Sequence, residues 1–391
     1  MMNVTSVKRI HQSDWTDSGV RFLRARDIVA AAKNEEPDDY LYISKEKYEE
    51  YSALSGKVGV SDLLVTGVGT IGVPYLVRNL EPLYFKDGNI IWFQNSDKID
   101  GKFLFYSFSA EQIQGFINES AGIGTVGTYT IESGKKTPIS LPNQIEQAKV
   151  GEFFQQLDNL ITLHQRKYDK LQVLKKAMLE KMFPKNGSSV PEIRFKGFTD
   201  AWEQRKLSEM CGTFEYGLNA AAKEFDGKNK YIRITDIDDT SREFLLSDLS
   251  SPDICLDGMS KYLLSSGDIV FARTGASVGK TYIYRENDGI VYFAGFLIRA
   301  KVNQDNDAEF VFQSTLSPSY EKYIRITSQR SGQPGVNAQE YGEYDLFAPS
   351  KEEQQRIGHF LRGIDNLITL HQRELEKLQN IKKSMLEKMF V

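Results

Sequence analysis

The residues that most resemble a ligand-binding or catalytic motif lie in the stretch 271–284, FARTGASVGKTYIY. Its centre, Gly275 to Gly279 followed by Lys280 and Thr281, is close to the loop that cradles nucleotide phosphates. That loop needs four residues between its glycines and a helix directly after it, so that backbone N–H groups and the helix N-terminus face the anion. Here three residues separate the glycines, and the β-prone run YIY follows. The sequence therefore predicts a glycine-rich turn between two strands rather than a nucleotide site.

The other patterns that could support catalysis or metal binding are weaker. Cys211 and Cys255 stand in no metal-ligand spacing and are too few for a disulfide framework. Residues 67–72 match a dinucleotide fingerprint only as an isolated pattern, because Val-Pro-Tyr follows them instead of a helix. Acids that would suit a metal-dependent nuclease, near Asp38 and Asp100, lie far apart in dissimilar contexts. We therefore expect no catalytic residue, no metal ligand and no cofactor on this chain.

Length and charge narrow the class of protein. The chain has 391 residues, 40% of them hydrophobic, which predicts a globular protein of two or three domains. A net charge of -4 argues against a protein held to nucleic acid by charge alone, but not against a sequence-specific binder with local basic residues. The N-terminus has no apolar signal region, and no stretch approaches the roughly 20 apolar residues of a membrane span. We expect a soluble, cytoplasmic protein with no membrane partner.

An internal repeat organises the chain. Residues 157–183 and 364–390 are identical at 20 of 27 positions, at an offset of 207 residues. This period is far longer than a solenoid unit, so the chain consists of two similar halves, each a globular domain followed by a long helix. The helices are almost duplicates, whereas the domains diverge. The contrast predicts identical partners for the two helices and different targets for the two domains.

Both repeated segments have the spacing of a coiled coil. Apolar side chains recur at intervals of three and four residues, and neither Gly nor Pro interrupts the two runs. A helix of about 40 residues is near 60 Å long, and each is expected to bury its seam in an antiparallel pair related by a pseudo-twofold axis. The predicted seam consists of Leu157, Ile161, His164, Tyr168, Leu171, Met178, Ile364, Ile368, His371, Leu375, Leu378 and Met385.

Polar residues on these helices have two interpretations each. His164 and His371 are either a metal or catalytic pair or, as we favour, polar residues that fix the register, because no carboxylate or Cys stands at ligand spacing beside them. Lysines at the end of each helix contact either solvent, which we favour, or DNA phosphates. These lysines are Lys175, Lys176 and Lys181, with Lys382, Lys383 and Lys388.

The globular parts correspond more faintly. Residues 22–28 align with 231–237, and both have the alternation of a half-buried strand. Residues 62–75 align with 268–282 once a single residue is inserted, which places Val73-Pro74 opposite Lys280-Thr281. The two copies therefore share a strand, a glycine-rich turn and a strand, while the Lys-Thr pair belongs to the second copy alone.

With this organisation, the chain resembles the DNA-specificity (S) subunit of type I restriction-modification systems over almost its whole length. The resemblance rests on the two domains, on the helix motifs DNLITLHQR and KKxMLEKMF, and on residues 198–207 and 331–337. It implies an α+β fold with two target-recognition domains, whose sheets are twisted and β-helix-like, and a long conserved helix after each. In that family each domain reads one half of a bipartite DNA site, and the helices set the spacer.

The resemblance also implies partners and cofactors. In the family the helices dock two modification methyltransferase subunits, and restriction-translocase subunits join for cleavage of double-stranded DNA. S-adenosylmethionine, ATP and Mg are then expected on those partner subunits, and this chain is expected to be non-catalytic. The tetrapeptide Asp/Asn-Pro-Pro-Tyr/Phe of the adenine methyltransferases is absent from it.

The glycine-rich turns become candidate DNA-facing loops. Small residues let a backbone approach the duplex, and neighbouring side chains donate hydrogen bonds to base edges or phosphates. An ordinary role at the surface or in strand pairing is the alternative for each of them. The candidates are Arg24, Arg26, Thr66, Thr70, Arg233, Arg273, Thr274, Ser277 and Lys280.

The expected boundaries follow from the repeat. They are residues 1–141 for the first target-recognition domain, 142–184 for its helix, 185–197 for a flexible linker, 198–348 for the second domain and 349–391 for its helix. The first domain has no counterpart of the segment WEQRKL at residues 202–207, which indicates a shortened or misassigned start. Two alternatives to an active specificity subunit stay open: a silent gene that donates half-domains by recombination, and a coiled-coil scaffold that does not bind DNA.

Overall fold

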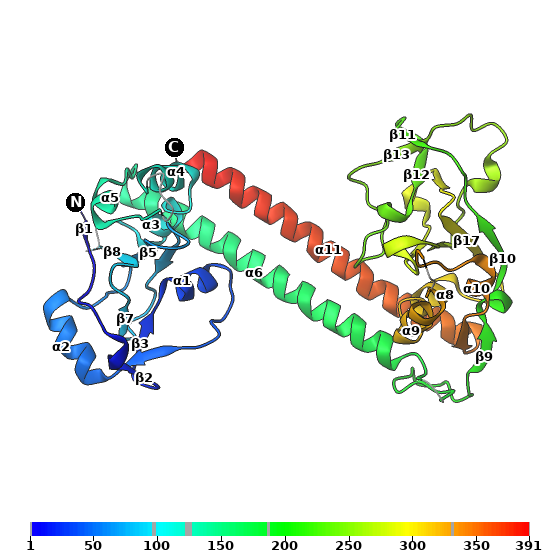
Figure 1. The fold of residues 1–391 in the computed structure, drawn as a ribbon, viewed down its shortest axis with the longest axis horizontal. Coiled ribbons are helices and arrows are strands. Elements are labelled where there is room, and N and C mark those ends of the chain that lie inside the picture. Colours follow the sequence, from blue (N-terminus) through cyan, green and yellow to red (C-terminus); the bar gives the residue numbers. More distant parts are fainter. Residues whose placement is uncertain (1, 96–98, 122–126, 186–187, 330–331, 391) are drawn as a thin grey trace. The chain divides into compact units, whose positions relative to one another are not determined.

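The computed structural model describes residues 2–95, 99–121, 127–185, 188–329 and 332–390, so Ser331 of one family segment and residues 186–187 of the expected linker lie outside it. The chain forms two compact units, unit 1 with residues 1–164 and 374–391 and unit 2 with residues 165–373. Each holds one domain of mixed helices and strands and adjoining parts of two long helices, α6 (Gln144–Lys181, green in Figure 1) and α11 (Lys351–Met389, orange to red).

Unit 1 contains two four-stranded sheets, in the orders β1-β8-β5-β6 and β2-β4-β3-β7. Strands β3 and β7 are parallel, and the other pairs are antiparallel. The elements before α6 are β1 (Asn3–Thr5), η1 (Gln12–Asp14), β2 (Trp15–Thr16), β3 (Val20–Leu23), α1 (Ala25–Ala32), β4 (Leu41–Ile43), α2 (Lys45–Ser55), β5 (Leu63–Thr66), β6 (Pro74–Leu76), β7 (Leu83–Phe85), β8 (Ile90–Gln94), α3 (Gly101–Ser107), α4 (Glu111–Ser120) and α5 (Ile131–Lys136).

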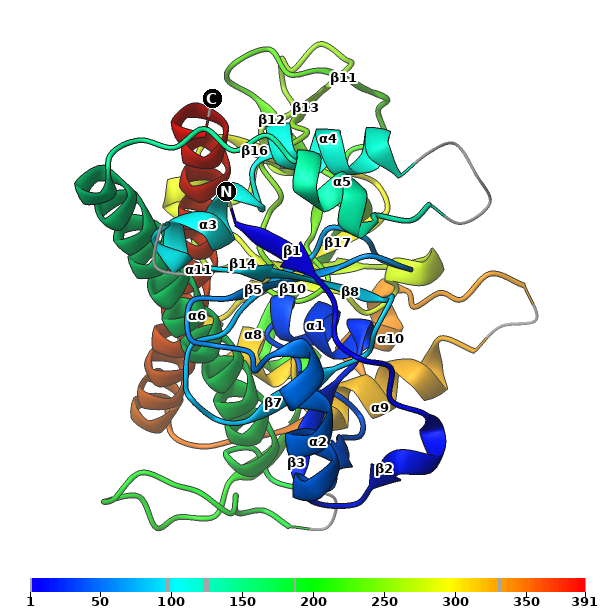
Figure 2. The ribbon, with the colours of Figure 1, turned by 90° about the vertical axis from the view of Figure 1, so that its left-hand side faces the viewer.

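The sheet β1-β8-β5-β6 is apolar on both faces. Alternate residues of a strand point to opposite sides of a sheet, and successive residues of β5 are apolar. Leu63 and Val65 belong to a cluster with residues of α3, α4 and α6, whereas Leu64 between them belongs to a second cluster with the other sheet and helices α1 and α2. Figure 2 shows α4 and α5 on one side of this sheet and α1 and α2 on the other. A strand buried on both faces in this way holds the turn that follows it in a fixed position.

Unit 2 repeats this plan. Its sheet β10-β17-β14-β15 has the strand order of the sheet in unit 1, and β12 and β16 form a parallel pair as β3 and β7 do. Its elements are β9 (Glu203–Lys206), α7 (Leu207–Met210), β10 (Cys211–Tyr216), β11 (Ala222–Glu224), β12 (Lys230–Ile232), η2 (Ile234–Asp236), β13 (Ser250–Pro252), η3 (Ser260–Tyr262), β14 (Asp268–Ala272), η4 (Gly275–Ser277), β15 (Thr281–Ile283), η5 (Glu286–Asp288), β16 (Val291–Phe293), β17 (Leu297–Val302), α8 (Ala308–Ser314), α9 (Pro318–Thr327), α10 (Ala338–Gly342) and β18 (Asp345–Ala348).

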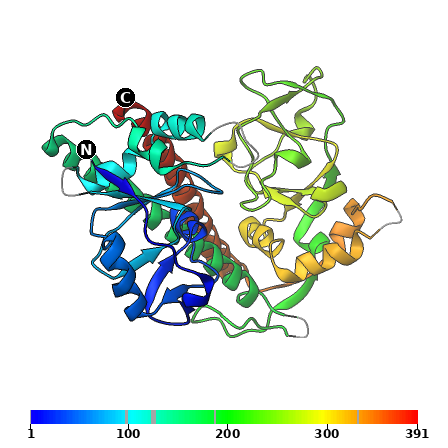
Figure 3. The same ribbon diagram turned by 60° about the vertical axis from the view of Figure 1, so that its left-hand side comes forward.

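The core of unit 2 is also divided by its sheet. Ile269 and Phe271 pack with α8, α9 and α11, while Val270 packs with β12 and β16 on the opposite face. Figures 1 and 3 show α8 and α9 on one side of these strands and the β11–β13 part on the other. The predicted α+β class, with two similar domains and a long helix after each, is confirmed.

Two expected strands, one in each unit, are shorter than predicted. In residues 22–28 the strand β3 ends at Leu23 and helix α1 begins, and in residues 231–237 the strand β12 ends at Ile232 and a 3-10 turn begins. In both cases an aspartate three residues after an arginine accepts that arginine's backbone N–H, as Asp27 does for Arg24 and Asp236 for Arg233. The carboxylate closes a helical turn, which overrides the alternating pattern of the sequence.

The long helices begin two residues after Pro142 and Pro349, at Gln144 and Lys351. Within unit 1, Leu157 near the start of α6 shares a cluster with Leu378 and Met385 near the end of α11. Within unit 2, Tyr168, Leu171 and Met178 pack in the cluster of Ile364 and Ile368 near the start of α11. The segments are therefore antiparallel in both units. Of the other predicted seam residues, Leu375 is buried, and Ile161, His164 and His371 are half-buried.

An ion pair, repeated at the offset of 207 residues, joins the two helices and a domain helix in each unit. In unit 1 the carboxylate of Asp158 accepts hydrogen bonds from Lys382 at 2.6 Å and from the Tyr106 hydroxyl at 2.7 Å. In unit 2 Asp365 pairs with Lys175 and accepts a hydrogen bond from Gln313 at 2.8 Å. We call these two sites the clamps. Lys175 and Lys382 thus contact carboxylates, which neither interpretation of the lysines included.

The second half of the expected linker is held on helix α11. Arg194 donates two hydrogen bonds of 2.7 Å to Glu353, whose side chain is 1% exposed. Phe195 packs edge-on against Phe360 with ring centroids 5.8 Å apart. The composition around residues 184–191 indicated flexibility, but the residues from 192 onward are bound to unit 2 by charge and aromatic contacts.

We predict that Asp365→Asn destabilises unit 2 by about 3 kcal/mol, because Lys175 is then left buried without its counter-charge. The equivalent Asp158→Asn in unit 1 is expected to cost only about 1 kcal/mol, since that ion pair is more exposed, at 28% and 32% against 11% and 20%. Urea unfolding followed by circular dichroism measures both changes. Equal losses in the two variants would contradict the assignment of the second clamp as a buried pair.

Candidate nucleic-acid interface

The glycine-rich turn of unit 2 is part of the packed domain. It joins β14 to β15, and both Gly275 and Gly279 have positive φ angles, 74° and 84°. A Cβ on Gly279 would lie 2.6 Å from Cγ2 of Ile324 in helix α9, so glycine is required both for the backbone conformation and for the close approach. A strand follows the turn instead of a helix, which excludes the phosphate-loop geometry.

The turn of unit 1 is built in the same way. Gly72 has a φ of 79°, and a Cβ on it would meet Cγ2 of Ile117 at 3.1 Å. Ile117 and Ile324 are equivalent at the offset of 207 residues, as are Gly72 and Gly279. The predicted correspondence between the two turns is therefore a correspondence of backbone shape and packing.

Arg273 follows β14, and its guanidinium lies over two aromatic rings. Its guanidinium carbon lies 5.3 Å from the ring centroid of Tyr216 and 5.6 Å from that of Phe296. Its backbone is fixed on both sides, because the N–H donates to the carbonyl of Phe296 and the carbonyl accepts from Val336. The guanidinium has no acidic partner among the described residues, and its buried Nε lacks a hydrogen-bond partner there. Arg273 is therefore a cation whose backbone is fixed and whose guanidinium can still donate hydrogen bonds.

A cavity of 660 Å³ opens beside this stack. Its lining combines exposed aromatic surface, since Tyr216 is 46% and Phe296 56% exposed, with backbone close to Gly217 and Gly295. Aromatic faces, small residues and a guanidinium suit contacts with base edges and sugars. The lining includes Tyr216, Asn219, Arg233, Thr235, Arg273 and Phe296.

Arg233 lines the same cavity but is bound by an acid. Its Nε and Nη2 each donate to Asp236 at 2.8 Å, and this hydrogen bonding raises the pKa of Arg233. Arg24 is the counterpart in unit 1, with Asp27 and Asp39 as partners. Burial opposes its charge, but the two carboxylates outweigh burial and raise the pKa of Arg24. Both arginines thus close the turns after their strands. A DNA contact would have to use the N–H groups of each guanidinium that are not bonded to an aspartate.

The other candidates of unit 1 are divided between exposed and buried positions. Arg26 is 60% exposed and pairs with Asp39, and Thr70 is exposed in the turn. Thr66 is 0% exposed, and its hydroxyl donates to the carbonyl of Thr70 and accepts from the N–H of Val73. This corrects the expectation for Thr66: its side chain supports the turn from inside and does not face a partner.

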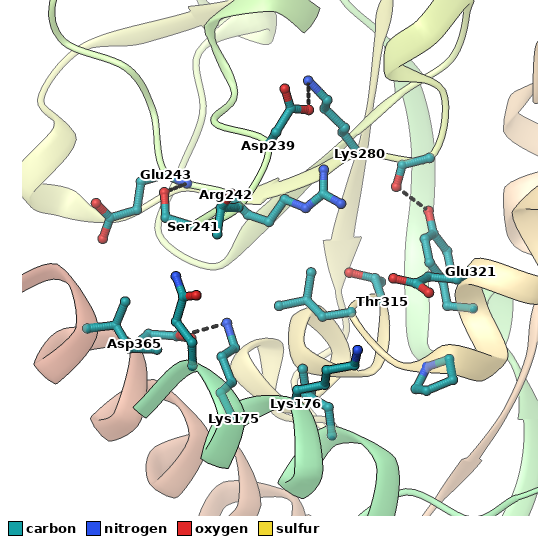
Figure 4. A pocket seen from close by; sticks show the side chains of 18 of the residues that line it. Lys175, Lys176, Asp239, Ser241, Arg242, Glu243, Lys280, Thr315, Glu321 and Asp365 are labelled. Atoms are coloured by element: carbon teal, nitrogen blue, oxygen red, sulfur yellow. Dashed lines mark hydrogen bonds and ion pairs between the residues drawn. The ribbon is translucent and has the colours of Figure 1, made fainter. Parts of the chain in front are cut away.

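The remaining candidates of unit 2 lie on different sides of the turn. Thr274 stays near Arg273, where its hydroxyl donates to the carbonyl of Pro334 at 3.5 Å, and Ser277 is half-buried in the turn. Lys280 pairs with Asp239 and faces a separate cavity of 650 Å³ above the second clamp. Figure 4 shows Lys280 and Arg242 on the domain side of this cavity and Lys175 and Lys176 rising from α6. Lys280 therefore does not act together with Arg273.

The charges around this second cavity nearly balance. Its lining includes Lys176 and Arg242 as well as Asp239 and Glu243, so it lacks the single sign of a nucleic-acid groove. In the described part of the chain no three His, Cys, Asp or Glu side chains are grouped so as to hold a metal ion. None of the described helices has the length and hydropathy needed to cross a bilayer.

Sequence comparison decides the family. The family described as the type I restriction modification DNA specificity domain matches residues 23–173 and 199–380, one match in each half. The chain belongs to this family. It is a specificity subunit with two target-recognition domains, and the exposed face around Arg273 lies on the second of them.

Individual relatives agree with this assignment. The type I restriction enzyme MjaVIII specificity subunit of Methanocaldococcus jannaschii is 25% identical over 307 residues, which span 75% of this chain and 70% of the relative. The crystal structure of the type I restriction-modification S subunit from M. genitalium matches at a TM-score of 0.59 and 15% identity, over 100% of this chain and 94% of that one. At this identity the structural match supports the fold alone.

Sequence reasoning missed several residues of the specificity subunit's candidate face. Tyr216 and Phe296 are far from Arg273 along the chain, and only the pairing of β10 and β14 with β17 brings them to it. The clamps were also missed, although the repeat carried a signal for them. Asp and Lys recur at the same positions of both helices. Opposite charges that are repeated beside a seam indicate an ion pair between the helices.

We predict that Gly279→Ala destabilises the second target-recognition domain by about 2–3 kcal/mol, because the new Cβ meets Ile324 in addition to the strain of the left-handed backbone. Gly69→Ala is the matched control, since Gly69 has a φ of 78° but no atom within 4 Å of an added Cβ. It is expected to lose about 1 kcal/mol from backbone strain alone. Urea denaturation compares the two, and a control as damaging as Gly279→Ala would refute the packing role.

Proposed function

We propose that each target-recognition domain of this specificity subunit reads one half of a bipartite DNA sequence, and that Arg273 reads a base in the second domain. The observation that carries the proposal is the guanidinium of Arg273, which lies over the rings of Tyr216 and Phe296 and has no acidic partner among the described residues. Arg24, Arg26 and Arg233 each have such a partner. Of these four arginines, Arg273 is therefore the best prepared to exchange solvent for a DNA acceptor.

The stack explains how Arg273 gains specificity rather than affinity alone. An arginine recognises guanine through two parallel N–H donors, which requires the plane of the guanidinium to be fixed. Contact with the rings of Tyr216 and Phe296 restricts the guanidinium before DNA arrives, so less side-chain entropy is lost on binding. Phe296 is exposed on the same face and can contact a thymine methyl group or a sugar.

The duplicated helices support a proposal about protein partners. Leu160 and Leu163 on α6 are exposed, and so are their equivalents Leu367 and Leu370 on α11. Two identical apolar surfaces suit two identical partners, and we assign them to two modification methyltransferase subunits, with restriction-translocase subunits joining the same complex. In this proposal S-adenosylmethionine, ATP and Mg bind to those partners, the chain itself is non-catalytic, and the length of the helices sets the spacer between the half-sites.

We expect Arg273→Ala to relax recognition at one base pair of one half-site, with a loss of about 1–3 kcal/mol of discrimination. Arg273 lines a cavity to which α6 and α11 contribute no residue, so assembly with methyltransferase subunits stays intact. Competition binding with single-base variants of the target measures discrimination at each position. Lys261→Ala removes a cation stacked on Tyr262 outside the cavity and serves as the control. Unchanged discrimination at every position in Arg273→Ala would exclude Arg273 as a base reader.

The role of the helices predicts a change in spacer length. Removal of one heptad from each helix, residues 167–173 and 374–380, shortens the pair by about 10 Å, or roughly three base pairs, and keeps the exposed leucines. We expect the preferred spacer to shorten by that amount or activity to be lost. Methylation protection on targets with graded spacers provides the measurement. Activity that keeps the original spacer would show that the helices do not set it.

A further inference from the structure

The backbone around Arg273 in unit 2 has an exact counterpart in unit 1. At the end of β14, the N–H of Arg273 donates to the carbonyl of Phe296, directly before β17, at 3.0 Å. At the end of β5, the N–H of Gly67 donates in the same way to the carbonyl of Asn89, directly before β8, at 2.8 Å. Gly67 therefore occupies the position of Arg273, and Asn89 occupies the position of Phe296.

Gly67 has no room for a side chain. A Cβ on it would lie 2.6 Å from the carbonyl oxygen of Tyr129. The N–H of Tyr129 donates to the carbonyl of Gly67 at 2.9 Å, so the two backbones are held at this distance. The first domain therefore cannot place a guanidinium where the second domain has Arg273.

The aromatic residues of the second domain are also replaced in the first. Tyr216 lies opposite Ile298 in the pairing of β10 with β17. Continued by one residue, the pairing of β1 with β8 puts Ser6 opposite Ile91, which is the equivalent of Ile298 next to the central strand. The hydroxyl of Ser6 donates to the carbonyl of Ile90 at 3.5 Å. The first domain thus has Ser, Gly and Asn where the second has Tyr, Arg and Phe.

The loop that carries Asn89 is fixed at its ends and open at its tip. Residues 86–89 join β7 to β8, one residue more than residues 294–296 between β16 and β17. The N–H of Lys86 donates to the carbonyl of Leu23 at 2.9 Å, which holds the first end. Gly88 has a φ of 69°, and no atom lies within 4 Å of a Cβ added to it. There is therefore space beside the side chain that follows.

The side-chain amide of Asn89 is available for a partner. The residue is half-buried, and its amide forms no hydrogen bond with another residue in the described part of the chain. Its own carbonyl is bonded to Gly67, so the backbone is held while the amide is not used. An asparagine amide offers one donor group and one acceptor, and this pair matches N7 and the N6 amino group of adenine in the major groove.

We propose that Asn89 reads an adenine in the half-site of the first domain, at the place in the fold where Arg273 reads a base in the second. The inference rests on the proposed function, in which each domain reads one half-site. The same backbone frame then presents an amide in one domain and a guanidinium in the other. Because asparagine suits adenine and arginine suits guanine, the two half-sites differ at the base pairs read by these positions.

Competition binding of the full chain, assembled with methyltransferase subunits, tests the proposal once sequencing of methylated adenines has mapped both half-sites. We expect Asn89→Ala to lower discrimination about tenfold at one A·T pair, in the half-site that Arg273→Ala leaves unchanged. Asn89→Asp has the same shape but loses the preference for adenine as well, because a carboxylate cannot donate to N7. Asn89→Gln keeps a donor and an acceptor and should retain the preference for adenine that Asn89→Ala loses.

Asn79→Ala is the matched control, because it removes an exposed amide from a different loop of unit 1. It should keep discrimination at every position. Both alanine variants should keep the melting temperature of the parent chain, since the carbonyl of residue 89 can still accept the N–H of Gly67.

Three results would overturn the inference while Arg273→Ala still relaxes its own half-site. They are unchanged discrimination in Asn89→Ala, equal weakening for all sequences, and a change at a G·C pair or in the half-site of Arg273. Equal weakening would indicate a phosphate contact in place of a base contact. If neither Asn89→Ala nor Arg273→Ala changes discrimination at any position, the proposed reading of DNA by Arg273 fails together with this inference.

Discussion

In each unit a single carboxylate joins three helices, and the way the long helices meet the domain is organised around it. Asp158 contacts Lys382 of the opposite helix and Tyr106 of α3, and Asp365 contacts Lys175 and Gln313 in the same way. A carboxylate in a partly dry position needs all of its lone pairs used, so the domain helix and the second long helix must both be in place. Burial and then the hydrogen bond to Asp158 raise the pKa of Tyr106, which keeps its hydroxyl a donor.

The clamp accounts for the difference between the long helices, which are nearly duplicate, and the domains, which diverge. The clamp requires Asp and Lys at fixed positions of both helices, and Gln147 and Gln354 add a second repeated contact by accepting the backbone N–H of Asp100 and Asp307. The loops after β5 and β14 carry no such requirement. There the two glycine turns keep their backbone shape and packing while the side chains around them differ, so the second domain can carry the stacked Arg273 without a change elsewhere in its fold.

The domain organisation and the long helices could be predicted from the sequence, because hydrophobic periodicity and the internal repeat indicate them directly. The helices, their antiparallel seam and the strand-turn-strand elements are of this kind. Residue roles that depend on a local competition were harder: Arg24 and Arg233 sit in patterns typical of strands, but aspartates three residues later convert the strand ends into turns. Thr66 stands beside a glycine-rich stretch that is typical of a surface loop, yet its side chain is buried. The stack on Arg273 depends on strand pairing across the sheet, which no local pattern indicates.

The composition of unit 1 has a consequence for the order of folding. Unit 2 is one continuous stretch, residues 165–373, whereas unit 1 joins the start of the chain to residues 374–391. Phe390 packs on Phe103 and Phe154, and Lys382 completes the clamp of Asp158. Because these contacts join residues that are more than 200 positions apart in the sequence, they form only after unit 2 has been synthesised. The domain of unit 1 precedes that of unit 2 in the sequence, yet it is the later of the two to be completed.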